Sequence, residues 1–253
     1  MTRIQTLLSS LLVTLAIATV QNCLAADAVP LKVGVTPIYP PMIYKENGKI
    51  SGVEVDFAKA LGEALGRPVE LVEVGWEDQI PALLDGRTDI IMSDMSITTA
   101  RQLRVAFAKP YLLTGQIALI RREDAYRYSL GFPMPPPGPV GVLKATTGDF
   151  LVQQELPKSK RKQFKSDEEA ATALKKKRID LFICDAPTVW WLAGLHEADG
   201  LVAVPIQLTK EQLAWGVRRS DADLLNAVNA ALDKLQSSGR ATEIIKRWIP
   251  LYH

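Results

Sequence analysis

The pattern that most restricts how this chain can fold is a repeated alternation of short apolar strands and helices. In the first third of the chain, strand-like segments occur at Leu31–Val35, Val69–Val74 and Asp89–Met92. Between them, Val55–Leu65 and Asp78–Leu84 carry apolar residues at helical spacing. Gly66 is placed to end the first of these helices, and the Asn-Gly pair within Glu46–Lys49 predicts a hairpin turn. Strands that alternate with helices in this way form mostly parallel sheets with helices on both faces. The sequence therefore predicts an α/β fold.

A second alternation of the same kind begins near residue 116. Its expected elements are the strand Gln116–Ile120, the strand Val140–Leu143, a helix from about Asp149, the helix Asp167–Lys176, the strand Ile179–Cys184, a helix through Trp190 and Trp191, and two closing helices at Ala222–Leu235 and Ala241–Trp248. The segment Tyr111–Gly115 connects the two alternations. Because ligands commonly bind between domains, we expect a hinge at this connection and a binding cleft between two α/β units.

The first 26 residues have the layout of a secretory signal peptide. One basic residue, Arg3, precedes the apolar run Leu11–Val20, and small residues follow it. The run is shorter than the about 20 apolar residues that a transmembrane helix needs. We therefore expect this leader to be cleaved and the protein to be exported. The alternative, a lipid anchor on Cys23 or an uncleaved anchor, is disfavoured because polar residues precede this cysteine.

The composition argues against several kinds of partner and site. The chain carries 30 basic and 28 acidic residues, a formal charge of +2, so nothing points to a nucleic acid partner. If Cys23 leaves with the leader, Cys184 is alone and no internal disulfide forms. The histidines, His196 and His253, do not stand at metal-ligand spacing, and no nucleophile elbow or phosphate-binding glycine motif is present. We expect neither a metal nor a cofactor.

A series of short sequence phrases runs along the chain after the leader. In order, they are Tyr39–Met42, Gly52–Leu61, Trp76–Leu84, Met95–Arg101, Phe107–Tyr111, Val140–Thr147, Ile179–Asp185 and the helical pair Leu224–Trp248. Together they resemble the amino acid-binding family of bacterial periplasmic solute-binding proteins, the family 3 receptors of ABC importers. The phrase Ser-Ile-Thr-Thr-Ala-Arg at residues 96–101 is the most specific of them.

This resemblance implies a type II periplasmic-binding-protein fold, in which a hinge crosses twice between two α/β lobes. Lobe 1 would comprise residues 27–112 and 208–253, and lobe 2 residues 113–207 with the hinge at its ends. A ligand that contacts both lobes shifts such a receptor toward its closed form. The resemblance also implies a monomer that delivers an amino acid-like ligand to the membrane subunits of an ABC importer.

The resemblance assigns four residues to the carboxylate of an amino acid. Arg101 matches the family's carboxylate-binding arginine, whose planar guanidinium makes two parallel hydrogen bonds, and Ser96 matches a hydroxyl that shares this role. Thr146 and Thr147 precede a helix whose free N–H groups attract an anion. Without the resemblance, Arg101 would be interpreted as a solvated surface charge and Thr147 as a helix cap.

Four further residues are expected around the ammonium and the side chain of the ligand. Asp185 matches the acid that binds the α-ammonium; its alternative role is to cap the next helix. Tyr39 and Trp76 match the aromatic pair that flanks the ligand side chain; otherwise they would be core residues. Asp94 stands where the family usually has Gly or Ser. It either adds a second anion that favours a cationic ligand or forms local hydrogen bonds.

Other positions also depart from the family pattern. Thr36 replaces an acid of receptors for basic amino acids, Lys144 and Ala145 replace small polar or Gly residues, and Met42 replaces an aromatic residue. The prolines of Gly131–Pro139 forbid a helix and predict an extended connector. Basic runs at 158–162 and 175–178 are interpreted as solvated charges or, alternatively, as a docking face for an acidic transporter surface or anionic lipid.

Three functions are compatible with these residues. The main hypothesis is capture and delivery of a ligand without chemistry, because Arg101 and Asp185 together suit an α-amino acid. The first alternative is a periplasmic dehydratase that acts on a cyclic diacid, with Asp94 or Asp185 as general acid. The second alternative is a ligand sensor for a membrane partner. On the main hypothesis the protein is not an enzyme.

Overall fold

The computed structural model describes residues 28–133, 136 and 138–250. The predicted leader with Cys23 lies outside the described residues, as do positions 134, 135 and 137 of the proline-rich stretch, so both predictions remain predictions. Within the described part of the chain, no helix is long and apolar enough to cross a membrane.

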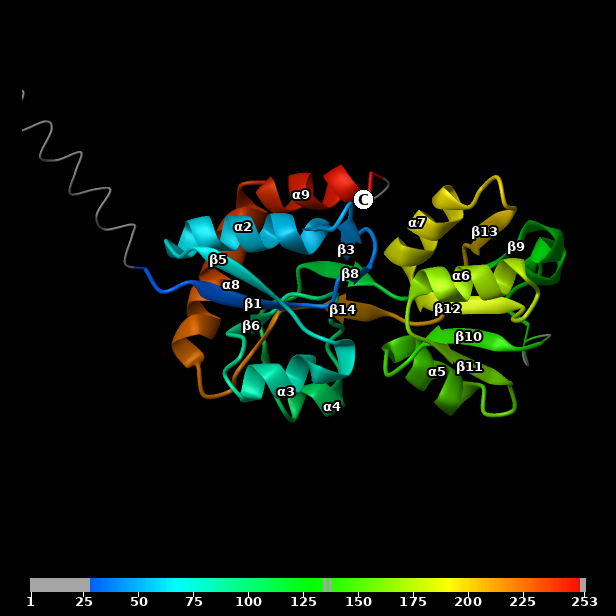
Figure 1. Cartoon of the computed structure of the whole chain (residues 1–253), viewed down its shortest axis with the longest axis horizontal. Helices are drawn as coiled ribbons and strands as arrows, with labels where there is room; N and C mark the ends of the chain where they lie inside the picture. Colours follow the sequence, from blue (N-terminus) through cyan, green and yellow to red (C-terminus); the bar gives the residue numbers. More distant parts are fainter. Residues whose placement is uncertain (1–27, 134–135, 137, 251–253) are drawn as a thin grey trace, which may run out of the picture.

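The first lobe is built on a five-stranded sheet with the strand order β5-β1-β6-β15-β7 (Figure 1). Its strands are β1 (Leu31–Val35), β5 (Val69–Glu73), β6 (Ile90–Ile91), β7 (Ala106–Phe107) and β15 (Gly216–Val217). Strand β1 pairs in parallel with β5 and β6, whereas β15 pairs antiparallel with β6 and β7. Four of the five strands therefore run in the same direction, and only β15 runs against them, so the predicted mostly parallel sheet is confirmed. Strand β15 comes from the last fifth of the chain and completes the sheet.

Helices cover both faces of this first sheet, as the alternation predicts. They are α2 (Val53–Leu65), η1 (Trp76–Asp78), α3 (Gln79–Leu84), α4 (Thr99–Gln102), α8 (Ala222–Ser237) and α9 (Arg240–Trp248). Figure 1 shows α2 and α9 on one face and α3 and α4 on the other. Helix α2 ends at Gly66, whose φ of 64° is the left-handed conformation that glycine adopts at little cost.

A small antiparallel sheet borders the first lobe where it faces the cleft. Its strands are β2 (Ile38–Tyr39), β3 (Ile43–Glu46) and β4 (Lys49–Ser51), and Glu46 pairs with Lys49. Asn47 and Gly48 form the predicted turn with positive φ at both residues, as a tight hairpin requires. The side chain of Tyr39 at the end of β2 is thereby held against the lobe.

The second lobe is built on another five-stranded sheet, with the order β11-β10-β12-β9-β13. Its strands are β9 (Gln116–Arg121), β10 (Val140–Leu143), β11 (Arg161–Phe164), β12 (Leu181–Asp185) and β13 (Leu201–Val204). Strand β10 is parallel to β11 and β12, and β9 runs antiparallel to β12 and β13. Strand β12 starts two residues later than predicted. It ends at Asp185, which is therefore part of the strand.

The helices of the second lobe are α5 (Thr147–Glu155), α6 (Asp167–Lys175) and α7 (Ala186–Leu195), and the 3-10 helix η2 spans Arg122–Tyr128. Val152 of α5 packs in one apolar cluster with Leu181 and Ile183, whereas Phe182 and Cys184 share the other cluster with α6 and α7. The sheet is thus covered on both faces (Figure 1). Helix α5 begins at Thr147, two residues before the predicted start.

Two short antiparallel strands lie between the sheets, β8 (Leu112–Thr114) and β14 (Glu211–Leu213) (Figure 1). The chain passes to the second lobe after β8 and returns before β14. At the first crossing, a side chain on Gly115 would collide with the carbonyl of Thr209. The predicted two-lobed fold with two crossings is confirmed, while the residue limits of the lobes stay predictions.

Candidate ligand-binding site between the lobes

A narrow cavity lies between the two lobes, with free space for about one water molecule. It is lined by Tyr39, Trp76, Asp94, Ser96, Arg101, Thr146, Thr147 and Asp185. These are the eight residues that the sequence predicts to bind a ligand, and the structure brings all of them together. The reason is topological, because segments that follow the carboxyl ends of parallel strands meet at one edge of each sheet.

Arg101 is held on the short helix α4 by its neighbours in the first lobe. Thr98 caps the helix and accepts a hydrogen bond from the Arg101 backbone N–H at 3.3 Å. Guanidinium Nη1 donates to the carbonyl of Ser96 at 2.7 Å, and Cζ lies 5.1 Å from the ring centre of Trp76. Arg101 is buried, with 9% of its surface exposed, and among the ion pairs of the described residues none involves it. The remaining N–H donors are therefore available to an anionic ligand group.

Burial lowers the pKa of Arg101, while the carboxylates of Asp185 and Glu211 oppose this shift. Arginine keeps its charge in proteins even when its pKa is reduced, because its ordinary value is so high. The alternative interpretation of Arg101 as a solvated surface charge is wrong.

The start of helix α5 brings backbone donors from the second lobe to the same cavity. Thr146 caps this helix, since its Oγ1 accepts from Asp149 N–H at 3.4 Å and donates to the Leu143 carbonyl at 2.8 Å. Thr147 is the first helical residue, and its Oγ1 accepts from Nε2 of Gln116 at 3.0 Å. The alternative role of Thr147 as the cap is wrong. N–H groups in the first turn of a helix have no partner within it and favour an anion.

Asp185 ends β12 directly before helix α7. Asp185 is the N-cap residue of α7 by position, as the alternative interpretation predicts, but its side chain makes no capping hydrogen bond with the helix. Its Oδ1 accepts from Nε2 of Gln116 at 3.0 Å. Burial raises the pKa of Asp185 to about 7 and Glu211 adds to this rise, whereas the Gln116 hydrogen bond and Arg101 oppose it.

Asp94 follows β6 and has a left-handed backbone with φ of 56°. Its N–H donates to Oε1 of Glu54 at 2.9 Å, and its buried Oδ1 has no hydrogen-bond partner among the described residues. Burial raises the pKa of Asp94 well above its ordinary value, and the nearby carboxylates of Asp185, Glu54 and Glu211 raise it further. Arg101 opposes the rise.

Glu54 is a buried carboxylate behind the cavity that sequence reasoning missed. It accepts hydrogen bonds from Tyr111 Oη at 2.8 Å and from Trp215 Nε1 at 2.9 Å in addition to the Asp94 backbone. The partners come from three distant parts of the chain. In the sequence, Glu54 differs from the exposed acidic residues of helices only in that it stands between two valines, Val53 and Val55. This is a weak signal that the carboxylate is buried.

Ser96 lines the cavity but directs its hydroxyl hydrogen elsewhere. Its Oγ donates to Oε2 of Glu211 at 2.6 Å, and Glu211 also accepts from Oγ1 of Thr209 at 2.7 Å. Because this hydrogen is donated to the Glu211 carboxylate, Ser96 has no hydroxyl hydrogen left for the carboxylate of a ligand. Glu211 on the connecting strand β14 and Gln116 on β9 are two further residues that sequence reasoning missed. Gln116 stands out only as the one polar residue at the start of an apolar strand.

The aromatic pair closes the cavity and reaches across it. The rings of Tyr39 and Trp76 lie edge to face with centres 5.4 Å apart. Nε1 of Trp76 donates to the carbonyl of Ala145 in the second lobe at 2.9 Å. The two substituted positions of this loop are thus part of the contact between lobes, because Lys144 also pairs with Glu77 at 2.9 Å. The structure has the lobes in contact over the cavity.

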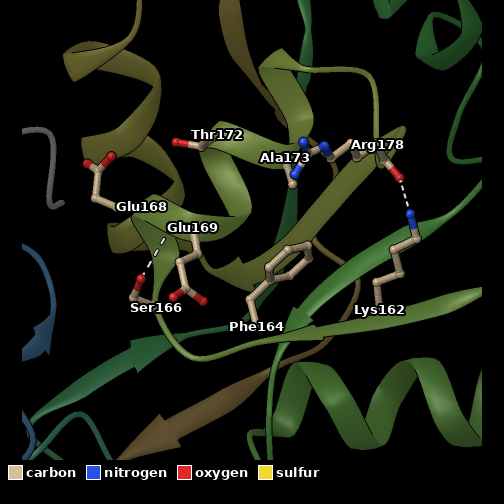
Figure 2. Close-up of a pocket in the computed structure, with 8 residues that line it drawn as sticks. All are labelled: Lys162, Phe164, Ser166, Glu168, Glu169, Thr172, Ala173 and Arg178. Carbon is tan, nitrogen blue, oxygen red and sulfur yellow. Dashed lines mark hydrogen bonds between the residues drawn. The ribbon is translucent and has the colours of Figure 1, made fainter.

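A second hollow lies far from these residues, on the second lobe. Figure 2 shows this lobe-2 groove, which Lys162, Phe164, Ser166, Glu168, Glu169, Thr172, Ala173 and Arg178 line between β11 and α6. Nζ of Lys162 donates to the Arg178 carbonyl at 2.5 Å, and Oγ of Ser166 accepts from Glu169 N–H at 3.2 Å. These polar groups hold neighbouring loops of the lobe, and none of the predicted site residues lies here.

Comparison with known proteins agrees with this geometry. The family described as bacterial extracellular solute-binding proteins, family 3, matches residues 31–250. A glutamine-binding protein of an ABC transporter from Bacillus subtilis is 29% identical over 208 residues, which cover 80% of this chain and 74% of that protein.

Solved structures give the same result. A mutant of the arginine-binding protein from T. maritima has a TM-score of 0.80 and 32% identity, and covers 87% of this chain and 95% of its own. An ancestral amino acid-binding protein, described as a precursor of cyclohexadienyl dehydratase, has a TM-score of 0.78 and 32% identity with the same coverage. The chain therefore belongs to family 3 of the bacterial extracellular solute-binding proteins.

Proposed function

We propose that this protein captures an α-amino acid between its lobes in the periplasm and delivers it to the membrane subunits of an ABC importer. The observation that carries the proposal is the presence of Arg101 and Asp185 in one narrow cavity whose walls come from both lobes. An amino acid needs a cation at one end and an anion at the other. The residues that line this cavity offer both charges.

The carboxylate of the ligand is bound from both sides of the cleft. Arg101 provides the planar pair of donors from the first lobe, and the first turn of α5 provides N–H groups from the second. A ligand that bridges these groups stabilises the closed arrangement more than the open one, which is the condition for ligand-driven closure.

The ammonium is bound by Asp185 of the second lobe. The pKa of this carboxyl is raised by burial to about 7 in the empty cavity, and an ammonium within hydrogen-bond distance stabilises its charged form. Tyr39 and Trp76 then flank the ligand side chain. The cavity shares Trp76, Arg101 and Thr147 with a wider cleft toward α4 and α5, so a longer side chain has room to extend there.

One observation favours a second candidate, a dehydratase of a cyclic diacid. Asp94 and Asp185 are buried acids whose pKa values are raised, as a general acid needs. A diacid, however, gives Asp185 no ammonium to bind, and a single arginine faces its two carboxylates. The binding function accounts for more of the cavity.

A thermal-shift screen of residues 27–253, refolded to remove carried ligand, tests the proposal. The panel contains the standard amino acids, ornithine, diamino acids, dicarboxylic acids and cyclic diacids. A ligand at about 100 times its Kd stabilises a protein by about 2.7 kcal/mol, which is several degrees for a chain of this size.

We expect a shift with one group of amino acids that Arg101→Ala and Asp185→Ala both abolish. Lys176→Ala, an exposed change in the second lobe, is the matched control and should leave the shift intact. The absence of a shift with every α-amino acid, or turnover of a cyclic diacid, would overturn the proposal.

A further inference from the structure

The charges around the cavity do not balance for an ordinary amino acid. Among the described residues that line it, Arg101 is the cation, and Asp94 and Asp185 are the carboxylates. An α-amino acid brings one carboxylate for Arg101 and one ammonium for Asp185. One carboxylate of the protein, Asp94, then has no opposite charge.

A negative charge on the Asp94 side chain would be shielded from water and would lack a hydrogen-bond donor among the described residues. The residue is 5% exposed, and its buried Oδ1 has no hydrogen-bond partner among the described residues. Its backbone N–H is already taken by Glu54. Because an unpaired buried charge is costly, the side chain must carry a proton or face a cation.

The groups around Asp94 are mostly acids, and they come from every element packed against it. Asp185 on β12, Glu54 on α2 and Glu211 on β14 raise its pKa, and Arg101 on α4 lowers it. The other titratable neighbours are Tyr39, Tyr111 and Cys184, whose own pKa values are all raised, first of all by burial. The surroundings therefore favour a proton on Asp94 in the empty cavity.

We infer that Asp94 is a second acceptor for the ligand's ammonium, and that the ligand expels a proton that Asp94 and Asp185 share in the empty cavity. A primary ammonium carries three N–H donors, so it can bind both carboxylates and still donate once more. The carboxyl pair releases this proton to solvent, and the positive charge of the ammonium takes the place of the proton's positive charge. This inference rests on the proposed function and adds to it a preference for ligands whose ammonium carries at least two N–H donors.

The pair loses its protons jointly, because the two carboxyls interact. Burial raises both pKa values in the empty cavity, and the ammonium lowers them on binding. Binding therefore releases a proton and becomes stronger as the pH rises. Where one proton is released, Kd falls about tenfold per pH unit.

Isothermal titration calorimetry at pH 7.5 measures the released proton directly. The amino acid that gives the largest thermal shift is titrated in phosphate and in Tris, whose ionisation enthalpies differ. We expect about one proton released per bound ligand in the unchanged protein. In Asp94→Asn, binding should persist, and proton release should fall by more than half. Asparagine tolerates the left-handed backbone of this position, so the variant is expected to fold.

Two further arms sharpen the test. Glu70→Gln, which removes an exposed carboxyl of the edge strand β5 in the first lobe, is the control and should release as many protons as the unchanged protein. The N,N-dimethylated form of the same amino acid keeps a single N–H donor and cannot donate to both carboxylates. It should bind at least about tenfold more weakly to the unchanged protein, and Asp94→Ser should narrow this difference in affinity. Circular dichroism of each variant establishes that it is folded.

The outcomes separate this inference from the proposed function. Binding without buffer-dependent heat, or undiminished proton release in Asp94→Asn, overturns the role of Asp94 and leaves the receptor function standing. If no α-amino acid binds, the proposed function is wrong and the role of Asp94 is wrong with it.

Discussion

The two lobes contribute to the cleft in different ways. The first lobe supplies the full positive charge of Arg101 and the second acid, Asp94, both fixed by buried hydrogen bonds. The second lobe supplies partial charges at the start of α5 and the carboxylate of Asp185, which Gln116 orients. From this difference we expect the first lobe to set most of the affinity for the ligand carboxylate. The second lobe sets how strongly a bound ligand favours closure.

The largest expected effect comes from removing the cation of the first lobe. Arg101→Ala should weaken binding by at least about 100-fold, because a buried charged hydrogen-bonding partner of the ligand is lost. Arg101→Lys should recover only part of this loss, since a lysine cannot bind a carboxylate with two parallel N–H groups. Calorimetric titration of both variants measures the effect. If Arg101→Ala and the unchanged protein bound the ligand with equal affinity, the role that we assign to the first lobe would be contradicted.

The next effect concerns the carboxylate of the second lobe. Asp185→Asn should weaken binding by about 30-fold, because the ammonium loses a charge-assisted partner. Titration of this variant next to Arg101→Ala tests whether the first lobe dominates. A greater loss in Asp185→Asn would reverse the order that we assign to the lobes.

The same change should stabilise the empty protein in a pH-dependent way. The pKa of Asp185 is raised from 3.8 to about 7 in the folded state, so the folded state holds a proton that the unfolded chain has released. This carboxyl therefore costs stability as the pH rises from about 4 to about 7. Asp185→Asn removes that cost, and its melting temperature at pH 8 should exceed that of the unchanged protein by at least about 2–4 °C. A difference that shrinks as the pH rises would contradict the assigned pKa direction.

A smaller effect is expected at the hydrogen bond that crosses the cleft. Trp76→Phe keeps an aromatic ring beside Tyr39 but removes the donor to the Ala145 carbonyl. A single hydrogen bond of this kind contributes about 0.5–1.5 kcal/mol, so Kd should rise by about threefold to tenfold. Stopped-flow measurement should place the change in the dissociation rate, because the bond forms only when the lobes close. An unchanged dissociation rate would show that this contact does not hold the lobes together.

The smallest effect is expected at the rim. Lys144 and Glu77 pair across the cleft, but their side chains are 56% and 59% exposed. Exposed pairs contribute about 0–1 kcal/mol and are screened by salt. Glu77→Gln should therefore change Kd by less than about fivefold, and 0.5 M NaCl should remove the difference in Kd. A larger or salt-independent effect would mean that closure depends on this pair.

The sequence predicts the elements of the fold well where a local signal is strong. Gly66 ends α2 as expected, and Asn47–Gly48 forms the expected hairpin turn. Helix α5 starts two residues before the predicted position, because Thr146, and not Thr147, caps it. Capping depends on which hydroxyl reaches the N–H two or three residues later, and adjacent threonines do not distinguish this.

The residues that line the cavity could be predicted, but the residues that hold them could not. The family resemblance names side chains at strand ends, and the structure gathers all eight. Glu54, Gln116 and Glu211 bond to partners that are far away in the chain, for example Gln116 to Asp185, 69 residues apart. A pattern along the sequence carries no signal for such pairs. The same limit explains why the hydroxyl of Ser96 was assigned to the ligand while the structure directs it to Glu211.

The central claim is tested most directly by a crystal structure of residues 27–253 with the amino acid that gives the largest thermal shift. We predict the ligand in the cavity between the lobes, with its carboxylate within hydrogen-bond distance of the Arg101 guanidinium and its ammonium within hydrogen-bond distance of Asp185. A ligand bound in the lobe-2 groove of Figure 2, or bound in the cavity with its ends reversed, would contradict the account.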